Sequence, residues 1–148
     1  MAQRYPTTPV AKPPITEEEL QSAIINLSGL CGWMRVHFRP ALTQAGNWVT
    51  PYTGDDGFSD IVLARNGCTV IAELKNAKNG ASNDQWEWLA AFAGTTVEEF
   101  KAIHKGSKFG GCVVNKCLLV ALWRPKHWKY IEAILRTWVS HEMKPRRK

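Results

Sequence analysis

The chain has 148 residues, enough for one compact domain with a buried core, and its 45% hydrophobic and 22% charged residues are ordinary for a globular protein. No apolar run approaches the roughly 18 residues of a membrane span, and the N-terminus MAQRYPTTPVAKPP lacks the apolar segment of a secretory signal. These features exclude a membrane protein and predict a cytoplasmic one, and the net charge of +6 favours a polyanionic partner, although solvated lysines explain the charge equally well.

The N-terminal part of the chain predicts an arm, a helix, a strand and a loop. Residues 1–15 are rich in proline and predict an extended arm. The capping-box sequence TEEE then predicts a helix over residues 17–29, which ends at two glycines. Residues 33–38 alternate between two faces, as a strand does, and residues 39–57, rich in Gly and Pro, predict a long loop. Loops of this length are often functional.

The sequence GFSDIVLARNGCTVIAELK, residues 57–75, predicts a β-hairpin with a functional end. Its Asn-Gly pair is the strongest short signal for a two-residue turn, and that turn sets the register of the two strands. In this register Asp60 lies opposite Glu73, and Lys75 shares their face. Because both strands are apolar on both faces, we expect the sheet to be covered on both sides and the two acids to lie at its rim.

The second half of the chain predicts helix, short helix, strand and helix. Ser82 and Gln85 form a potential capping box before the helix DQWEWLAAFA, and TTVEEFKAIHK predicts a short helix. CVVNKCLLVALW predicts one strand or two short ones, and PKHWKYIEAILRTWV predicts a final amphipathic helix. The predicted fold is therefore α/β, in the order α-β-β-β-α-(α)-β-α, with one domain over residues 16–140 and a basic tail over 141–148.

Two adjacent carboxylates repel each other unless a positive charge lies between them. One interpretation is a purely structural ion cluster in which Lys75 supplies that charge. The other is a divalent cation, Mg²⁺ or Mn²⁺, held by Asp60 and Glu73, because hard cations prefer carboxylate oxygens together with water and substrate phosphate. Lys75 would then orient or deprotonate a water molecule, or stabilise negative charge on a phosphate.

A third acid is available at the start of the first helix. On a helical wheel Glu17 lies at the edge of the face defined by Leu20 and Ile24, whereas Glu18 points away and Glu19 lies on the other flank. Glu17 is therefore the best-placed acid to reach inward. The alternative is that all three acids only satisfy the preference of helix N-termini for negative charge.

Cysteines and tryptophans allow further interpretations. The four cysteines predict small buried thiols, and a zinc site from Cys112, Cys117, His104 and His127 matches no compact ligand spacing. Trp86 and Trp88 point in different directions from one helix, so one is expected in the core and the other is free to meet a base or a partner. We favour core or interface roles for both.

In this order, the motifs resemble a nuclease family. GFSD, a turn, AELK and a helix bearing Gln85 resemble the restriction-endonuclease-like PD-(D/E)XK core, a mixed central sheet flanked by helices. TEEELQ, GW, HFRP, GNWVTPYTGDDGF and WRP extend the resemblance to its VRR-NUC branch, which occurs as stand-alone phage and bacterial proteins and in larger DNA-repair nucleases. The resemblance covers roughly residues 16–136 and implies a bacterial cell or a phage-infected host.

This resemblance implies roles for individual residues. Asp60, Glu73, the Leu74 carbonyl and Glu17 become metal ligands for Mg²⁺ or Mn²⁺, and Lys75 becomes the catalytic lysine. Gln85 matches a glutamine that projects to the active site, with a purely capping role as the alternative. Ser59 departs from the family, which usually has proline there, and we expect a slight loosening of the backbone at this position.

The implied activity is a divalent-metal-dependent DNA endonuclease, similar to Holliday-junction resolvases that act on branched DNA as homodimers. Flaps, nicks or a specific site, as in homing and restriction enzymes, are alternative substrates. A non-catalytic basic DNA-binding module and a basic structural protein are the alternatives from other classes. Candidate phosphate contacts flank the proposed site, and each is equally explained as a solvated surface charge: Arg35, His37, Arg39 and Lys78.

Overall fold

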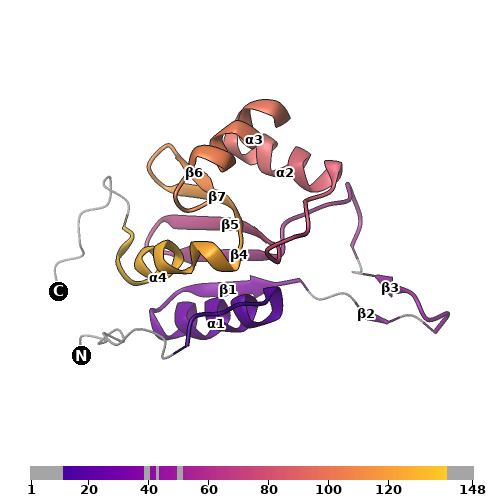
Figure 1. The fold of residues 1–148 in the computed structure, drawn as a ribbon, viewed down its shortest axis with the longest axis horizontal. Coiled ribbons are helices and arrows are strands. Elements are labelled where there is room, and N and C mark those ends of the chain that lie inside the picture. Colours follow the sequence, from indigo (N-terminus) through magenta and orange to yellow (C-terminus); the bar gives the residue numbers. More distant parts are fainter. Residues whose placement is uncertain (1–11, 39–40, 43, 50–51, 140–148) are drawn as a thin grey trace.

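The computed structural model describes residues 12–38, 41–42, 44–49 and 52–139. Most of the predicted arm, residues 1–11, and the basic tail, 141–148, lie outside the described residues. The described chain is a mixed α/β structure in which helices cover both faces of a five-stranded sheet (Figure 1). No helix in this part of the chain is both long enough and apolar enough to cross a bilayer.

The elements follow one another in an order close to the predicted one, with additional short strands. They are α1 (Glu17–Leu30), β1 (Met34–His37), β2 (Ala41–Leu42), β3 (Trp48–Val49), β4 (Ile61–Arg65), β5 (Cys68–Leu74), α2 (Asn83–Ala93), α3 (Val97–Gly106), β6 (Gly111–Val114), β7 (Leu118–Trp123), the 3₁₀ helix η1 (Pro125–His127) and α4 (Trp128–Thr137).

The main sheet has the strand order β1-β4-β5-β7-β6. Only the central pair β5 and β7 is parallel, and the other neighbours are antiparallel. The strand predicted as one or two pieces is a hairpin of β6 and β7, whose turn holds Asn115 and Lys116 at positive φ. The predicted loop over 39–57 was incomplete, because it contains the small antiparallel pair β2–β3, which projects from the body at the right of Figure 1.

The predicted hairpin register is confirmed. Asn66 and Gly67 have φ values of 49° and 81°, as a type I′ turn requires. Arg65 pairs with Cys68, and the ladder runs on to Ile61 opposite Ala72. Asp60, one residue before β4, therefore falls opposite Glu73.

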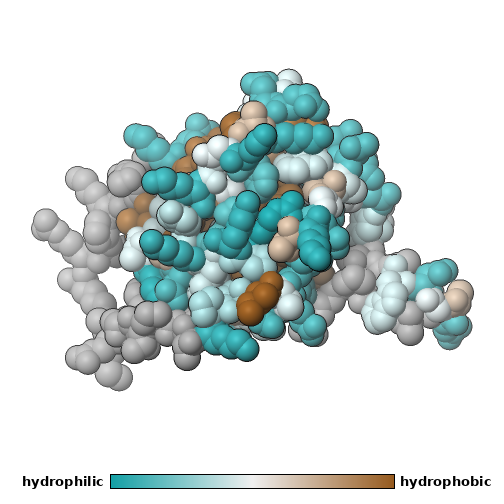
Figure 2. Space-filling model, viewed as in Figure 1, coloured by the Kyte–Doolittle hydropathy of each residue, from teal (hydrophilic) through white to brown (hydrophobic). Residues whose placement is uncertain are grey.

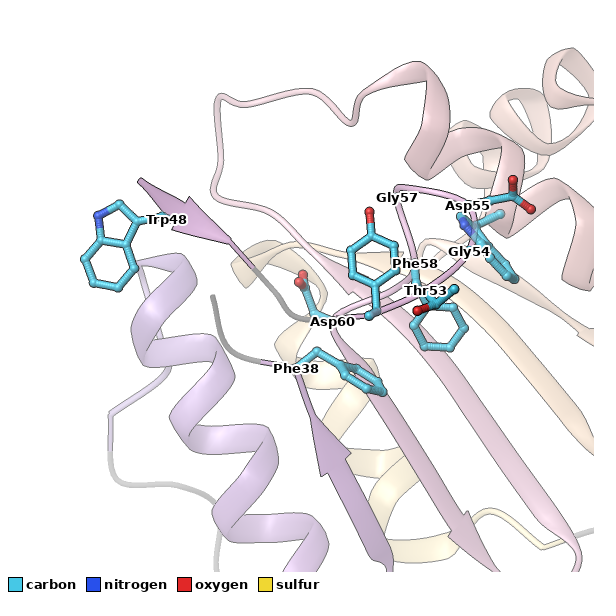
Figure 3. A pocket seen from close by; sticks show the side chains of 10 residues that line it. Phe38, Trp48, Thr53, Gly54, Asp55, Gly57, Phe58 and Asp60 are labelled. Atoms are coloured by element: carbon cyan, nitrogen blue, oxygen red, sulfur yellow. The ribbon is translucent and has the colours of Figure 1, made fainter. Parts of the chain in front are cut away.

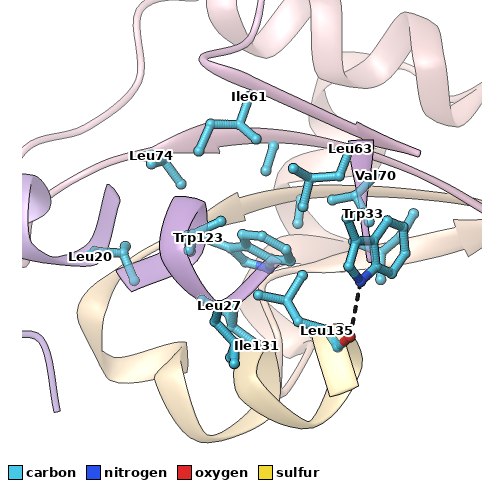
Figure 4. Packing of buried hydrophobic residues seen from close by; sticks show 14 of the residues in the cluster. Leu20, Leu27, Trp33, Ile61, Leu63, Val70, Leu74, Trp123, Ile131 and Leu135 are labelled. Carbon is cyan, nitrogen blue, oxygen red and sulfur yellow. Dashed lines mark hydrogen bonds between the residues drawn. The ribbon is translucent and has the colours of Figure 1, made fainter. Parts of the chain in front are cut away.

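Two hydrophobic clusters cover the two faces of the sheet, as predicted from the apolar strands. α1 and α4 pack on one face, and α2 and α3 on the other. On the α4 face the Trp33 indole nitrogen donates to the Leu135 carbonyl at 2.9 Å (Figure 4). The buried Arg65 guanidinium donates to the carbonyls of Cys31, Leu135 and Trp138, so the C-terminal ends of α1 and α4 are both tied to the end of β4.

The helix starts follow the sequence signals with one difference. Ser82 and Thr96 cap α2 and α3 in complete capping boxes. At α1 the Thr16 hydroxyl accepts from the Glu19 amide, but the Glu19 carboxylate accepts from Ile15 rather than from Thr16. The capping box is therefore incomplete, because the bond from the Glu19 side chain goes to the residue before the N-cap.

Candidate active site

Asp60 and Glu73 meet at one end of the sheet. Asp60 Oδ2 accepts from the Leu74 backbone N–H at 2.9 Å, so the carboxylate is fixed to the partner strand. Glu73, near the end of β5, is 1% exposed. Its Oε1 lies 3.6 Å from Lys75 Nζ, whereas its Oε2 is buried and has no hydrogen-bond partner. The hairpin thus brings together the three residues expected at its end.

The electrostatics at this end are dominated by burial. Loss of solvent raises the pKa of Glu73 to about 9, the neighbouring charge of Asp60 acts in the same direction, and Lys75 opposes both. One ammonium therefore does not neutralise the pair. A buried carboxyl with an unpaired oxygen is costly for the fold, and such groups gather at functional sites.

Glu17 is the acid of α1 that faces the site. It is half-buried, whereas Glu18 and Glu19 are exposed. Burial and then the charge of Asp60 raise the pKa of Glu17, while Lys75 and a hydrogen bond from the Asn76 backbone lower it. The helical wheel therefore selected the acid that lies within electrostatic range of Asp60.

Gln85 combines the two roles that the sequence presents as alternatives. Its Oε1 accepts from the Ser82 backbone N–H at 2.9 Å, which closes the capping box of α2. Its Nε2 donates to Glu73 Oε1 at 2.8 Å. Because the cap uses the oxygen, the amide group of Gln85 must direct its nitrogen toward the acid.

The donor set fits a divalent cation in part. Two carboxylates lie side by side, and Glu73 Oε2 is free to accept a ligand bond. The N–H and C=O of a strand residue point to the same neighbouring strand, so the Leu74 carbonyl faces the Asp60 side together with its N–H. Among the described residues, however, no group of three His, Cys, Asp or Glu side chains is arranged to hold a metal. A cation here would therefore depend on two carboxylates, a carbonyl, and water or substrate oxygens, a set that Mg²⁺ accepts.

A pocket of about 720 Å³ opens beside Asp60. Figure 3 shows Asp60 between Phe38 and Phe58 on one side and Trp48 on the other. Trp48 is 71% exposed, and Phe58 packs edge-to-face on Phe38. The sequence predicts a functional loop here and offers Trp48 and Tyr52 as residues that could stack on a base, and both line the pocket. It does not predict the phenylalanines, because nothing local in the sequence places Phe58 against Phe38.

The loop before Asp60 is fixed to α2. The Trp88 indole nitrogen donates to the Asp56 carbonyl at 2.9 Å. Gly57 has φ +92°, and a Cβ atom there would lie 2.5 Å from the Asp84 backbone carbon, so only glycine allows this approach. Ser59, the departure from the family pattern, is buried and its hydroxyl has no partner.

The predicted phosphate contacts are dispersed. Arg35 is exposed, but its guanidinium lies against Gly29 at the end of α1, away from the acids. The His37 ring bonds with Gln21. Lys78 is exposed in the turn that follows Lys75. Arg39 lies outside the described residues. Of these residues, Lys78 is therefore the best placed to contact a phosphate near the site.

Arg124 is a positioning residue that the sequence reasoning missed. One of its guanidinium nitrogens donates to the Asn76 carbonyl at 2.7 Å and to the Asn79 carbonyl at 2.6 Å, so Arg124 fixes the loop after Lys75. The WRP sequence, residues 123–125, marks Arg124 as part of a motif, but it does not indicate that the guanidinium bonds to Asn76 and Asn79.

The expected thiols and tryptophans have structural roles. Cys31 and Cys68 are buried, as predicted, whereas Cys112 and Cys117 are only half-buried, and none belongs to a metal group in the described chain. Trp86 packs on the second core cluster, and Trp88 ties the loop to α2.

Comparisons of the chain with protein-family models, with curated proteins and with solved structures find no significant match.

Proposed function

We propose that this protein is a Mg²⁺- or Mn²⁺-dependent DNA endonuclease with a PD-(D/E)XK core of the VRR-NUC type. The observation that carries the proposal is the buried Glu73 carboxylate beside Asp60, with one oxygen unpaired and Lys75 3.6 Å from the other. This arrangement does not stabilise the fold, because a buried acid without a full set of partners lowers the free energy of unfolding. A bound cation would offset that loss of stability and would supply the Lewis acid for hydrolysis.

In the proposed mechanism, Asp60, Glu73 and the Leu74 carbonyl would hold the cation, with Glu17 as a further acid within electrostatic range. When bound, the cation polarises the scissile phosphate and lowers the pKa of a water molecule. Gln85 keeps Glu73 in its orientation. Lys75, 17% exposed at its side chain, would orient the attacking water or stabilise charge on the phosphate as an ammonium, and it could deprotonate the water only as a neutral amine. The attacking water would form a bond to phosphorus and lose one proton to bulk water, while the bond to the leaving oxygen breaks and that oxygen takes one proton from bulk water.

A non-catalytic DNA-binding module is the main alternative from another class. Binding alone gains nothing from clustered carboxylates near phosphate, and the buried acid pair argues against it. Branched DNA cut by a homodimer is the substrate class we propose, and flaps, nicks or a specific site are the alternatives within the same chemistry.

The test is cleavage of labelled four-way junction, flap and linear duplex in Mg²⁺, in Mn²⁺ and in EDTA. Wild type is compared with Asp60→Asn and Lys75→Ala, which should abolish cleavage while circular dichroism and melting show a folded chain. Glu98→Gln and Lys129→Ala are matched controls on exposed helix positions, and they should cut as wild type does.

Each outcome decides one part of the proposal. Cleavage that survives Asp60→Asn or Lys75→Ala overturns the site assignment. Metal-independent DNA binding with no cleavage in any metal favours the binding module. Equal cutting of all three substrates removes the selectivity for branched DNA and leaves a general nuclease.

A further inference from the structure

A second hollow, of about 530 Å³, lies on the α2–α3 side of the molecule and is lined mainly by basic residues. Its cations come from three separate segments: α3, the loop after it, and the segment from the end of β7 through η1. We call it the basic hollow and define it by Lys101, Lys105, Lys108, Arg124 and Lys126. Figure 2 shows hydrophilic side chains over α3, at the top of the molecule.

The positive charge of the basic hollow is largely uncompensated. Among the residues that the structure describes, no carboxylate lines it. Lys101 lies 3.8 Å from Glu98, an exposed pair of small energetic value. Within the described chain no carboxylate lies within ion-pair distance of Lys105, Lys108 or Lys126. Mutual repulsion among these charges is therefore a standing cost, which a bound polyanion would remove.

The histidines of the hollow do not contribute to this charge at neutral pH. His127 Nδ1 accepts from the Arg124 backbone N–H at 2.9 Å, and His104 Nδ1 bonds with the Gly110 carbonyl. Burial lowers the pKa of both rings, that of His127 to about 4. The two histidines therefore form part of the wall of the hollow, and the lysines supply its positive electrostatic potential.

One structural role for the cations is to balance the negative end of α3, where the last turn contains His104 and Lys105. Lys108 follows that helix, and Arg124 and Lys126 come from another part of the chain, so helix balancing does not account for the whole set.

The basic hollow adjoins the candidate active site through two direct links. Arg124 bonds to the carbonyls of Asn76 and Asn79, in the loop that begins directly after Lys75. Trp86, which lines the hollow, directly follows Gln85, which holds Glu73. The loop that carries Lys78 therefore connects the end of β5, where the acids lie, to Arg124 in the wall of the hollow.

We propose that the basic hollow binds the phosphate backbone of the nucleic acid on one side of the cleavage point. This inference rests on the proposed function and adds to it a second contact surface. Lysine ammonium groups recognise phosphate as point charges, without reading the bases, so the hollow sets position and affinity rather than sequence.

The test is DNA binding in EDTA, measured by fluorescence anisotropy at several salt concentrations. The variant Lys105→Gln/Lys108→Gln/Lys126→Gln is compared with Lys12→Gln/Lys116→Gln/Lys129→Gln, which changes the net charge equally at exposed positions outside the hollow. The hollow variant should bind at least about 10-fold more weakly, and its salt slope should fall by about 0.9 for each lost phosphate contact. A Lys→Arg triple variant at the same hollow positions should bind as wild type does.

Equal weakening by the two Gln variants overturns the proposal, since net charge alone would then explain binding. An unchanged salt slope in the hollow variant overturns it as well. Hollow-dependent binding to phosphatidylserine vesicles, without hollow-dependent binding to DNA, assigns the surface to a membrane and contradicts the proposal.

These outcomes are separable from failure of the nuclease proposal. The binding assay needs no metal and no turnover, whereas the nuclease proposal is judged by cleavage in Mg²⁺ and its loss in Asp60→Asn. If wild type cuts DNA and the hollow variant binds DNA as tightly as wild type, only the proposal for the basic hollow is refuted. If wild type does not cut DNA but the hollow variant binds it more weakly than wild type, only the nuclease proposal is refuted.

Discussion

The acid pair, Asp60 and Glu73, and the basic hollow are joined by the loop after Lys75, and they hold charge in different ways. At the acid pair, Glu73 is 1% exposed and retains an unpaired oxygen. In the basic hollow, Lys105 and Lys126 are exposed to solvent and line the same surface. Buried charges interact strongly and depend on exact geometry, whereas exposed charges are screened by salt and add up. The first arrangement suits chemistry at one atom, and the second suits holding a long polyanion.

The largest expected effect is on catalysis at the acid pair. Glu73→Gln keeps the shape of the side chain but removes the charge that would hold a cation, so cleavage should fall by a factor on the order of 10³ or more. Single-turnover cleavage of labelled DNA in Mg²⁺ measures this loss. A loss below about 10-fold removes Glu73 from the proposed ligand set, and Glu98→Gln serves as the exposed control.

The next largest effect is a pH dependence at the wall of the basic hollow. The folded-state pKa of His127 is lowered to about 4 by burial, so the folded protein resists a proton that the unfolded chain binds below about 6.5. The contribution of neutral His127 to the free energy of unfolding is therefore fully present above about pH 6.5. It is lost as the pH falls toward 4, by up to about 3 kcal/mol. His104 acts in the same direction, and Lys126 and Arg124 add to the shift.

Urea unfolding at pH 7.5 and pH 5 measures this loss. His127→Asn keeps an acceptor for the Arg124 N–H and should show a smaller fall between the two pH values. An equal fall in wild type and variant assigns the pH dependence to other groups.

At the acid pair the same kind of measurement should give the opposite sign. The folded-state pKa of Glu73 is raised above its unfolded value, so its contribution is complete below about pH 4.5 and is lost as pH rises through about 9. Glu73→Gln does not titrate. In EDTA at pH 8 to 9 the variant should therefore be more stable than wild type, by about 1–3 kcal/mol.

Added Mg²⁺ should raise the melting temperature of wild type and leave that of Glu73→Gln unchanged, because only wild type binds the ion. If Glu73→Gln is less stable than wild type in EDTA at pH 8 to 9, the buried Glu73 carboxyl does not destabilise the fold, and this prediction is wrong.

The smallest effect concerns turnover in the hollow variant. Lys105→Gln/Lys108→Gln/Lys126→Gln should raise KM by about 10-fold at moderate salt and change kcat by less than about 3-fold, because these groups bind substrate and transition state equally. Steady-state cleavage at two salt concentrations separates the two constants. A fall in kcat alone would show that the lysines of the hollow act in the chemical step rather than in substrate binding.

Sequence reasoning could predict the acid pair because local chemistry determines it. The Asn66-Gly67 turn fixes the register, and the register alone brings Asp60 to Glu73. Glu17 follows from helical periodicity, because the apolar residues of α1 determine which acid faces inward.

The rest of this end depends on tertiary contacts. Arg124 reaches Asn76 and Asn79 across more than forty residues of sequence, and no local pattern specifies such a bond. The basic hollow is likewise assembled from α3 and η1, which only the packed fold brings together. The strand pair β2–β3 was missed because two-residue strands have too few positions for an alternating pattern.

The Gln85 amide joins the start of α2 to the acid pair as a single rigid link, since one end of it accepts from Ser82 and the other donates to Glu73. Any event that moves Glu73, such as cation entry, proton gain or substrate departure, must therefore weaken or strengthen the hydrogen bond from the Ser82 backbone N–H to Gln85. The Ser82 amide proton is a built-in reporter, and its hydrogen-exchange rate would follow the occupancy of the site from outside it.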